Sequence, residues 1–209
     1  MTIKAILFDM DGVLIDAREW HYEALNKALN HFGFFISLES HLSTFDGLPT
    51  KNKLDILSKS IGLPNSLIDL INNLKQKYTI QKSNLFCNPK FNHIYALSRL
   101  KKKYKIAVCS NSTKNTIQTL MSLSKLEPYL DFIISNEDVK YPKPDKEMYV
   151  KAMGKLNLKP YECLIVEDNE NGIKSAKASG GHILEVKDPN EVTYNLITSK
   201  IQEIEGDYI

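Results

Sequence analysis

Two aspartates separated by one residue, Asp9 and Asp11, are the first residues whose types and spacing could do chemistry. They follow the apolar run Ile3–Phe8, which is typical of a buried strand. Residues two apart on a strand point to the same face, so the two carboxylates are expected to point the same way before Gly12 lets the chain turn. Because crowded carboxylates repel one another and lose hydration, this arrangement favours a bound cation or a reaction over a purely structural role.

The elements that must position these acids are predicted from the alternation of apolar strands and helical segments after about residue 85. This alternation predicts an α/β fold, with a parallel sheet covered by helices on both faces. A closing helix is predicted over Val192–Ile204. The predicted strands are Ile3–Phe8, Lys105–Cys109, Asp131–Ile134, Cys163–Val166 and His182–Val186.

Sheets of this kind carry their sites at the carboxyl ends of the strands, and chemically useful residues follow four of the predicted strands. Asp9 and Asp11 follow the first strand, and the hydroxyl-rich loop Ser110–Thr113 follows the second. Lys143 lies in the loop after the third strand, and Glu167-Asp168 follows the fourth. Acids, hydroxyls and a lysine that converge in this way are expected to handle a phosphate group together with a divalent metal.

The expected metal is Mg²⁺, because hard oxygen ligands suit it. Asp9 and Asp168 are the expected side-chain ligands, and Glu167 is expected nearby, either as a ligand or indirectly. An attacking carboxylate is repelled by an anionic phosphoryl group, at about 4 kcal/mol for unit charges ~4 Å apart in a partly solvated site. Lys143 is expected to supply positive charge against this repulsion.

The two aspartates are expected to divide the work of hydrolysis. Asp9 is the predicted nucleophile, which forms an aspartyl-phosphate. Asp11 is predicted to protonate the leaving oxygen and then to activate water, which requires a pKa nearer neutrality. Ser110 and the backbone N–H groups of residues 111–113 are expected to hold the phosphate oxygens, with Asn111 among the substrate contacts.

The segment 17–82 shows helical periodicity throughout and is predicted to be an inserted helical cap. The catalytic core is then expected to comprise residues 1–16 and 83–209, with hinges near 14–17 and 81–85. A helix start is predicted at Pro49-Thr50, with Thr50 as the cap. The substrate pocket is predicted between cap and core, and its expected cap residues are His21, Gly47, Thr50 and Lys51.

The order of Asp9/Asp11, Ser110, Lys143 and Glu167-Asp168 resembles the four motifs of haloacid dehalogenase-like phosphohydrolases over nearly the whole chain. This resemblance implies a Rossmann-like core, Mg²⁺ and aspartyl-phosphate chemistry. The implied metal residues are Asp9, Asp11, Glu167 and Asp168. The helical insert resembles the cap of the phosphoglycolate phosphatase and β-phosphoglucomutase branch.

The sequence also departs from that branch. The third motif carries Lys146 where a second proline is usual, so Lys140 or Lys146 could compete for the role of Lys143. β-Phosphoglucomutase-like members carry an arginine in the cap loop, and the loop Gly47–Lys51 has none, which weakens a mutase interpretation unless Lys51 or Lys53 substitutes. A histidine at the place of His21 is the one feature that favours such an interpretation.

Composition narrows the remaining classes. The 209 residues carry a net charge of +2 at pH 7, so nothing indicates a nucleic-acid or membrane partner. No apolar run approaches the ~20 residues of a membrane span. Three cysteines without a C-x-x-C pair, and a first stretch unlike a secretion signal, favour a reduced, cytoplasmic setting, and a monomer is the default.

The sequence therefore predicts a Mg²⁺-dependent phosphatase for a small phosphorylated metabolite of the sugar phosphate or phosphoglycolate class. The alternative is a phosphosugar mutase that uses the same aspartyl-phosphate. A third possibility is a non-catalytic protein that binds a phosphate ligand on the same scaffold.

Overall fold

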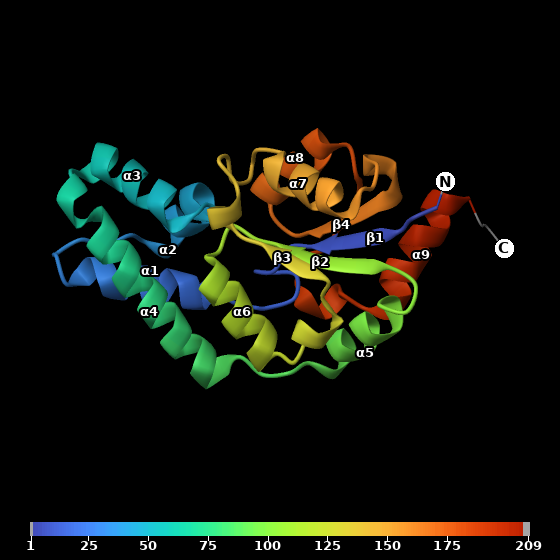
Figure 1. The fold of residues 1–209 in the computed structure, drawn as a ribbon. Coiled ribbons are helices and arrows are strands. Elements are labelled where there is room, and N and C mark those ends of the chain that lie inside the picture. Colours follow the sequence, from blue (N-terminus) through green and yellow to red (C-terminus); the bar gives the residue numbers. More distant parts are fainter. Residues whose placement is uncertain (1, 207–209) are drawn as a thin grey trace.

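A computed structural model describes residues 2–206 and shows a parallel sheet at the centre of the molecule (Figure 1). The strand order is β3-β2-β1-β4-β5, and each neighbouring pair is parallel. This order places β1, which precedes Asp9, between β2 and β4. The strands are β1 (Ala5–Phe8), β2 (Lys105–Cys109), β3 (Phe132–Ile134), β4 (Cys163–Glu167) and β5 (His182–Glu185).

Helices cover both faces of this sheet, because successive strand residues point to opposite sides and both sides are apolar. Ile6 and Phe8 pack against the helices of one face, and Ala5 and Leu7 pack against those of the other. The first face carries α5 (Phe91–Leu100), α6 (Lys114–Leu123) and α9 (Tyr194–Glu205), and the second carries α7 (Glu147–Leu156) and α8 (Glu170–Ser179). The predicted Rossmann-like α/β fold is confirmed.

The segment between β1 and α5 forms a helical lobe beside the sheet, which we define as residues 18–86 (Figure 1). It has its own hydrophobic cluster, whose members include Leu25, Leu54 and Ile71. Its elements are α1 (Arg18–Asn30), α2 (Leu38–Ser40), a π-helical turn (His41–Phe45), α3 (Thr50–Ile61) and α4 (Ile68–Phe86). One short 3₁₀ turn of the lobe covers Asn65–Leu67. The other 3₁₀ turns follow the lobe in sequence and cover Glu127–Tyr129, Asn136–Asp138, Pro160–Glu162 and Pro189–Glu191.

One local expectation in this lobe was wrong. Thr50 is the first residue of α3, and Pro49 occupies the cap position without a side-chain hydrogen bond. The buried face of α4 follows Ile71, Lys75 and Thr79, and Leu70 is exposed. A lysine and a threonine therefore occupy positions that periodicity alone assigns to apolar side chains.

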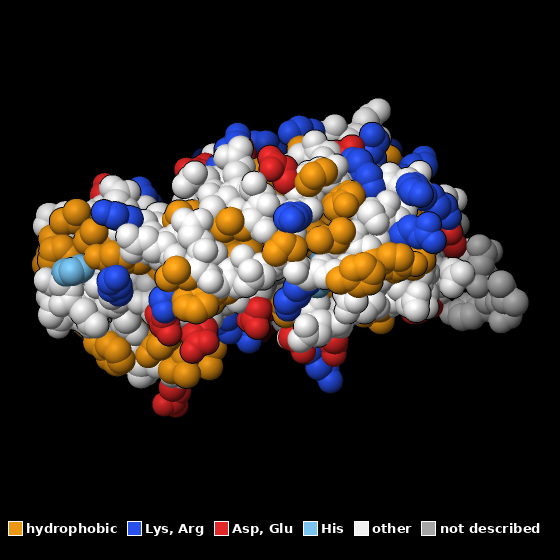
Figure 2. Space-filling model, turned by 90° about the horizontal axis from the view of Figure 1, so that it is seen from below, with side chains coloured by type: hydrophobic (Ala, Val, Ile, Leu, Met, Phe, Trp, Pro, Cys, Tyr) orange, Lys and Arg blue, Asp and Glu red, His pale blue; other side chains and the backbone are white. Residues whose placement is uncertain are grey.

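The face that includes α4 and α5 shows hydrophobic side chains intermingled with charged ones (Figure 2). The basic run 101–103 directly follows the end of α5, and Lys101 pairs with Asp131 at 2.6 Å. Cations beside the C-terminus of a helix oppose its dipole, which explains this run without a binding partner. Within residues 2–206, no helix is both long enough and apolar enough to cross a membrane.

Candidate active site

Asp9 leaves the end of β1 at the centre of the carboxyl edge of the sheet. Its N–H donates to the carbonyl of Val166 at 2.9 Å, so the backbone there stays tied to β4. Gly12 then turns the chain with a φ of +86°, a conformation that other residues rarely adopt. A Cβ at Gly12 would also collide with the Asp168 carboxylate, so this glycine lets the loop approach the acids of the fourth strand end.

Asp9, Glu167 and Asp168 form a carboxylate cluster in which each offers an oxygen within 4.8 Å of the others. Burial, and then the neighbouring acids, raise the pKa of Asp9 well above its usual value, although Lys143 opposes this. Burial and the charge of Glu167 also raise the pKa of Asp168, to about 6. A hard divalent cation would offset this crowding, and the oxygen donors present fit one.

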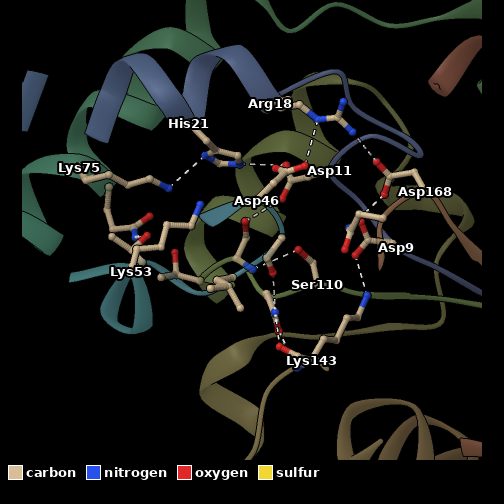
Figure 3. A pocket seen from close by; sticks show the side chains of 18 residues that line it. Asp9, Asp11, Arg18, His21, Asp46, Lys53, Lys75, Ser110, Lys143 and Asp168 are labelled. Atoms are coloured by element: carbon tan, nitrogen blue, oxygen red, sulfur yellow. Dashed lines mark hydrogen bonds and ion pairs between the residues drawn. The ribbon is translucent and has the colours of Figure 1, made fainter. Parts of the chain in front are cut away.

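Lys143 is a buried cation that lies against this cluster (Figure 3). Its Nζ donates to Asp9 Oδ1 at 2.7 Å, to Glu167 Oε1 at 2.6 Å and to the Cys109 carbonyl at 2.7 Å. Burial lowers the pKa of Lys143, but the two carboxylates outweigh it and the net pKa is raised above 10.5. The competing Lys140 and Lys146 are both exposed.

The loop after β2 supports both the lysine and the helical lobe. Asn111 holds the backbone of Lys143 by two hydrogen bonds of 3.0 Å, and it donates to the Gly47 carbonyl of the lobe at 2.8 Å. Ser110 is buried, lines the pocket and accepts a hydrogen bond from the Ser112 N–H at 3.1 Å. The loop therefore brings hydroxyl and N–H groups to the edge where Asp9 lies.

Asp11 lies in a different environment from Asp9 and outside the cluster of three carboxylates. Ser112 Oγ donates to it at 2.9 Å, and His21 Nε2 lies 3.0 Å from its Oδ1. Burial raises the pKa of Asp11, but His21, Ser112 and then Lys75 outweigh it, so the net pKa is lowered. This direction contradicts the expectation that the Asp11 pKa lies nearer neutrality in the protein alone, because its hydrogen bonds stabilise the charged form.

His21 connects Asp11 to the lobe, since its Nδ1 lies 3.0 Å from the Lys75 ammonium. Burial and the charge of Lys75 lower the pKa of His21. A neutral His21 that accepts from Lys75 at Nδ1 must carry its proton on Nε2, and it donates this proton to Asp11. Sequence reasoning found His21 but missed Lys75. The signal for Lys75 is its position, four residues after Ile71 and therefore on the same buried face of α4.

Arg18 is a second residue that sequence reasoning missed. Its guanidinium pairs with Asp168 Oδ2 at 3.0 Å and with Asp46 Oδ2 at 3.3 Å, so it ties the lobe to the carboxylate cluster. Its only sequence signal is its place at the start of the first lobe helix, two residues after Asp16. Asp46 gave no signal beyond that of a turn.

These groups enclose a pocket between the lobe and the sheet, with a cavity volume of about 60 Å³. Lys51, an expected substrate contact, lies outside the pocket, where it is exposed and pairs with Asp69 at 3.0 Å. Glu167 is buried beneath the pocket and is held by Lys143 and Tyr149. The other predicted site residues line it: Asp9, Asp11, His21, Gly47, Thr50, Ser110, Asn111, Lys143 and Asp168.

Comparisons with curated proteins find relatives along most of the chain. A phosphorylated carbohydrates phosphatase from Thermotoga maritima is 28% identical over 184 residues, covering 85% of this chain and 82% of the relative. Pyrophosphatase PpaX from Bacillus mycoides is 28% identical over 194 residues, covering 86% of this chain and 81% of the relative.

Solved structures share the fold. β-Phosphoglucomutase from Clostridium difficile superposes with a TM-score of 0.85 at 22% identity, covering 98% of this chain and all of that one. CbbY from Rhodobacter sphaeroides, solved with xylulose-(1,5)bisphosphate, has a TM-score of 0.81 at 20% identity and covers 88% of this chain and 86% of its own. The sequence profile of haloacid dehalogenase-like hydrolases matches residues 6–186. The chain therefore belongs to the haloacid dehalogenase-like hydrolase family.

Proposed function

We propose that this chain is a Mg²⁺-dependent phosphatase that hydrolyses a small phosphorylated metabolite through an aspartyl-phosphate on Asp9. As a hydrolase of this family, it is an enzyme that acts on phosphate esters. One observation carries the finer proposal: a buried ammonium, Lys143, holds Asp9 and Glu167 beside Asp168 at the pocket floor. The phosphatase names of the curated relatives support the same reaction class.

In the first half of the reaction, an oxygen of Asp9 attacks phosphorus and the bond from phosphorus to the ester oxygen breaks. The leaving oxygen takes a proton from Asp11. Lys143 fixes the orientation of the Asp9 carboxylate and adds positive charge where the phosphoryl group is transferred. Mg²⁺, held by Asp9 and Asp168 with Glu167 beside them, would supply the remaining charge that offsets repulsion between nucleophile and phosphate.

In the second half, Asp11 accepts a proton from water, which attacks the aspartyl-phosphate and releases inorganic phosphate. Asp11 must first carry a proton, although its pKa in the protein alone is lowered. An anionic phosphate ester beside Asp11 disfavours its charged form and therefore raises its pKa. Ser110 and the N–H groups of residues 111–113 are proposed to hold the phosphate oxygens, in keeping with their place at the start of α6.

The helical lobe is proposed to act as a cap, with residues 17–82 moving against a core of residues 1–16 and 83–209. The pocket volume of about 60 Å³ is far below the roughly 300–1,000 Å³ of pockets that bury drug-sized ligands. Entry of a metabolite therefore requires that the lobe swing away, which breaks the contacts of Arg18 with Asp168 and of His21 with Asp11. The proposed hinges lie near 14–17 and 81–85.

A phosphosugar mutase is the second candidate, favoured by the contact of His21 with Asp11 and by the buried lysines of the lobe. A mutase keeps water away from the aspartyl-phosphate while the bound sugar phosphate reorients, whereas a phosphatase admits water. The two activities separate in one assay that follows phosphate release and sugar phosphate isomer exchange in parallel. Phosphate release without exchange supports the phosphatase.

A screen of phosphorylated sugars and phosphoglycolate, with and without Mg²⁺, tests the proposed function. We expect phosphate release from at least one ester with Mg²⁺, and its loss when EDTA removes the metal. Release that is unaffected by EDTA would contradict the proposed metal role. No release from any ester, with no isomer exchange, would contradict the proposed activity.

Gly172→Ala should weaken Mg²⁺ binding without touching a ligand. A Cβ at Gly172 would collide with the Glu167 carboxylate, which Lys143 and Tyr149 hold in place. Displacing a group that orients metal ligands costs about 10- to 100-fold in metal affinity, and we expect a loss in that range. Two measurements check this: the Mg²⁺ concentration that gives half-maximal activity, and the rise in melting temperature when Mg²⁺ is added.

Gly154→Ala is the matched control for this substitution. Gly154 lies inside α7, and a Cβ there meets no described atom within 4 Å. Alanine is the better helix former by about 1 kcal/mol, so this variant should be slightly more stable and bind Mg²⁺ normally. Equal Mg²⁺ affinities in the two variants would show that the Glu167 position does not matter for the metal.

A further inference from the structure

The three acids of the carboxylate cluster are paired with two different cations of the chain. Lys143 pairs with Asp9 and Glu167 and, within residues 2–206, makes no ion pair with Asp168. The cation paired with Asp168 is Arg18, whose Nη2 lies 3.0 Å from Asp168 Oδ2 (Figure 3). One of the two cations therefore comes from the core, and the other comes from the helical lobe.

A second acid, Asp46, orients the guanidinium of Arg18. The Arg18 Nε lies 3.3 Å from Asp46 Oδ2, and the Asp46 carbonyl accepts a hydrogen bond from the Asn171 side chain of the core at 3.1 Å. Because a guanidinium presents its N–H groups as a planar fork, one arginine can bridge two carboxylates. In the described part of the chain, the pair with Asp168 is the one ion pair of an arginine or lysine that joins lobe to core.

Both oxygens of Asp168 already accept a hydrogen bond. Arg18 donates to Oδ2, and the side-chain amide of Asn169 donates to Oδ1 at 3.2 Å. A divalent ion that binds Asp168 must therefore displace a donor or accept the guanidinium as a close neighbour. The Asp168 side chain is only 2% exposed, and like charges repel strongly where water does not screen them.

We propose that Arg18 and Mg²⁺ compete for Asp168, so that metal binding releases the helical lobe from the core and the metal-free protein is held closed. We call the ion pair of Arg18 with Asp168 the latch. The inference rests on the proposed function, which makes Asp168 a Mg²⁺ ligand, and it adds how access to that site is controlled. The metal then has to bind before the ester, because the closed pocket of about 60 Å³ is too small for a metabolite.

Other contacts between lobe and core allow the lobe to close again over metal and ester. The Asn111 side chain donates to the Gly47 carbonyl at 2.8 Å, and the Thr116 hydroxyl donates to Gln76 at 3.3 Å. Neither contact involves an acid of the carboxylate cluster. These contacts can therefore re-form with the metal in place, whereas the latch cannot.

Arg18→Gln tests the competition, because glutamine keeps a polar side chain and removes the charge. Calorimetry with Mg²⁺ alone, at constant ionic strength, measures the metal affinity. Coupled binding events change each other's affinity by about 5- to 150-fold, so we expect Arg18→Gln to bind Mg²⁺ at least about 5-fold more tightly than wild type. The Arg18 side chain is partly exposed, and exposed ion pairs add little to stability, so the variant should remain folded.

A second measurement follows the position of the lobe. Spin labels attached through Lys59→Cys in α3 and Lys177→Cys in α8, both exposed positions, report the distance between lobe and core. The three native cysteines are buried and should not take the label. Mg²⁺ should lengthen this distance in the protein with Arg18. Arg18→Gln should show the longer distance without metal, because its latch is already absent.

Two control variants separate the latch from a general effect of charge. Arg99→Gln makes the same change at an exposed position of α5 and should match wild type in both measurements. Lys53→Met removes a cation that lines the pocket but does not pair with Asp168, so it should leave the lobe distance unchanged. A gain in Mg²⁺ affinity in Lys53→Met as large as that in Arg18→Gln would attribute the effect to pocket charge alone and overturn the competition.

The two measurements separate failure of the latch from failure of the proposed function. Equal Mg²⁺ affinities in wild type and Arg18→Gln, or a lobe distance that Mg²⁺ does not change, overturn the latch even if phosphate release is observed. A tighter affinity in Arg18→Gln, together with a distance that Mg²⁺ lengthens, supports the latch even if no ester is hydrolysed. Absence of Mg²⁺ binding in both proteins would overturn the latch and also contradict the proposed metal role.

Discussion

Asp9→Asn should lose at least about 10⁴-fold in kcat on any ester that the wild type hydrolyses. The amide keeps the shape of the side chain but cannot attack phosphorus, and it removes one anionic ligand from the carboxylate cluster. The loss should appear in kcat and should not be recovered at high Mg²⁺. Steady-state phosphate release in Mg²⁺ titrations measures it.

The same variant should remain folded. Burial raises the pKa of Asp9 well above its usual value, so the charged carboxylate contributes unfavourably to the metal-free fold at neutral pH. Its replacement by a neutral amide should therefore not lower the free energy of unfolding. Asp55→Asn, at an exposed acid of α3 outside the pocket, should keep full activity. An active Asp9→Asn variant would refute the nucleophile assignment.

Lys143→Met should have the second largest effect, and it should affect both activity and stability. Loss of one preorganised charge donor costs up to about 10³-fold in rate, and we expect a loss of that order in kcat. Removal of one partner from a buried ion pair destabilises a fold by about 3–5 kcal/mol, because the remaining charges are left unpaired. Asp9 and Glu167 are those remaining charges.

The loss of stability in Lys143→Met should be larger at pH 9 than at pH 6. The pKa of Lys143 is raised above 10.5 by Asp9 and Glu167, which outweigh burial, so the wild type carries this charge at both pH values. In the variant the pKa of Asp9, which Lys143 lowers, rises further, and a proton taken up at the lower pH removes part of the unpaired charge. Denaturant unfolding at the two pH values measures the difference. Lys146→Met, at an exposed lysine of the same motif, should match wild type in both assays. A loss of activity and stability in Lys146→Met, with none in Lys143→Met, would assign the role to Lys146.

The core of the site could be predicted because its residues follow the strands that carry them. Each predicted strand lies within two residues of an observed one, so the positions of Asp9, Ser110 and Asp168 at one sheet edge followed from local pattern alone. Lys143 was harder, since Lys140 and Lys146 lie in the same stretch and could compete for its role. The structure decides between them, because it places Lys143 against two carboxylates.

The lobe side of the site could not be predicted in the same way. Lys53 and Lys75 lie on helix faces where periodicity expects apolar residues, and only the three-dimensional packing shows that these faces meet the pocket. Sequence reasoning expected Lys51 as a substrate contact and left Lys51 and Lys53 open as substitutes for an arginine of the cap loop; Lys51 is exposed, whereas Lys53 lines the pocket. The contacts of Arg18 with Asp46 and Asp168 join residues far apart in sequence, which local patterns cannot detect.

The central claim is that the phosphoryl group passes through the Asp9 carboxylate. Borohydride reduces an aspartyl-phosphate to homoserine. A reacting sample is therefore quenched with borohydride, and mass spectrometry of the peptide 5–18 tests the claim directly. With an ester whose leaving oxygen departs without a proton, such as 4-nitrophenyl phosphate, the Asp11→Asn variant should accumulate the intermediate, because Asp11 activates the water that removes it. We predict homoserine at position 9 in that variant, only when ester and Mg²⁺ are both present. Formation of product by the enzyme with position 9 unmodified, and with homoserine or phosphate found at another residue, would contradict the account.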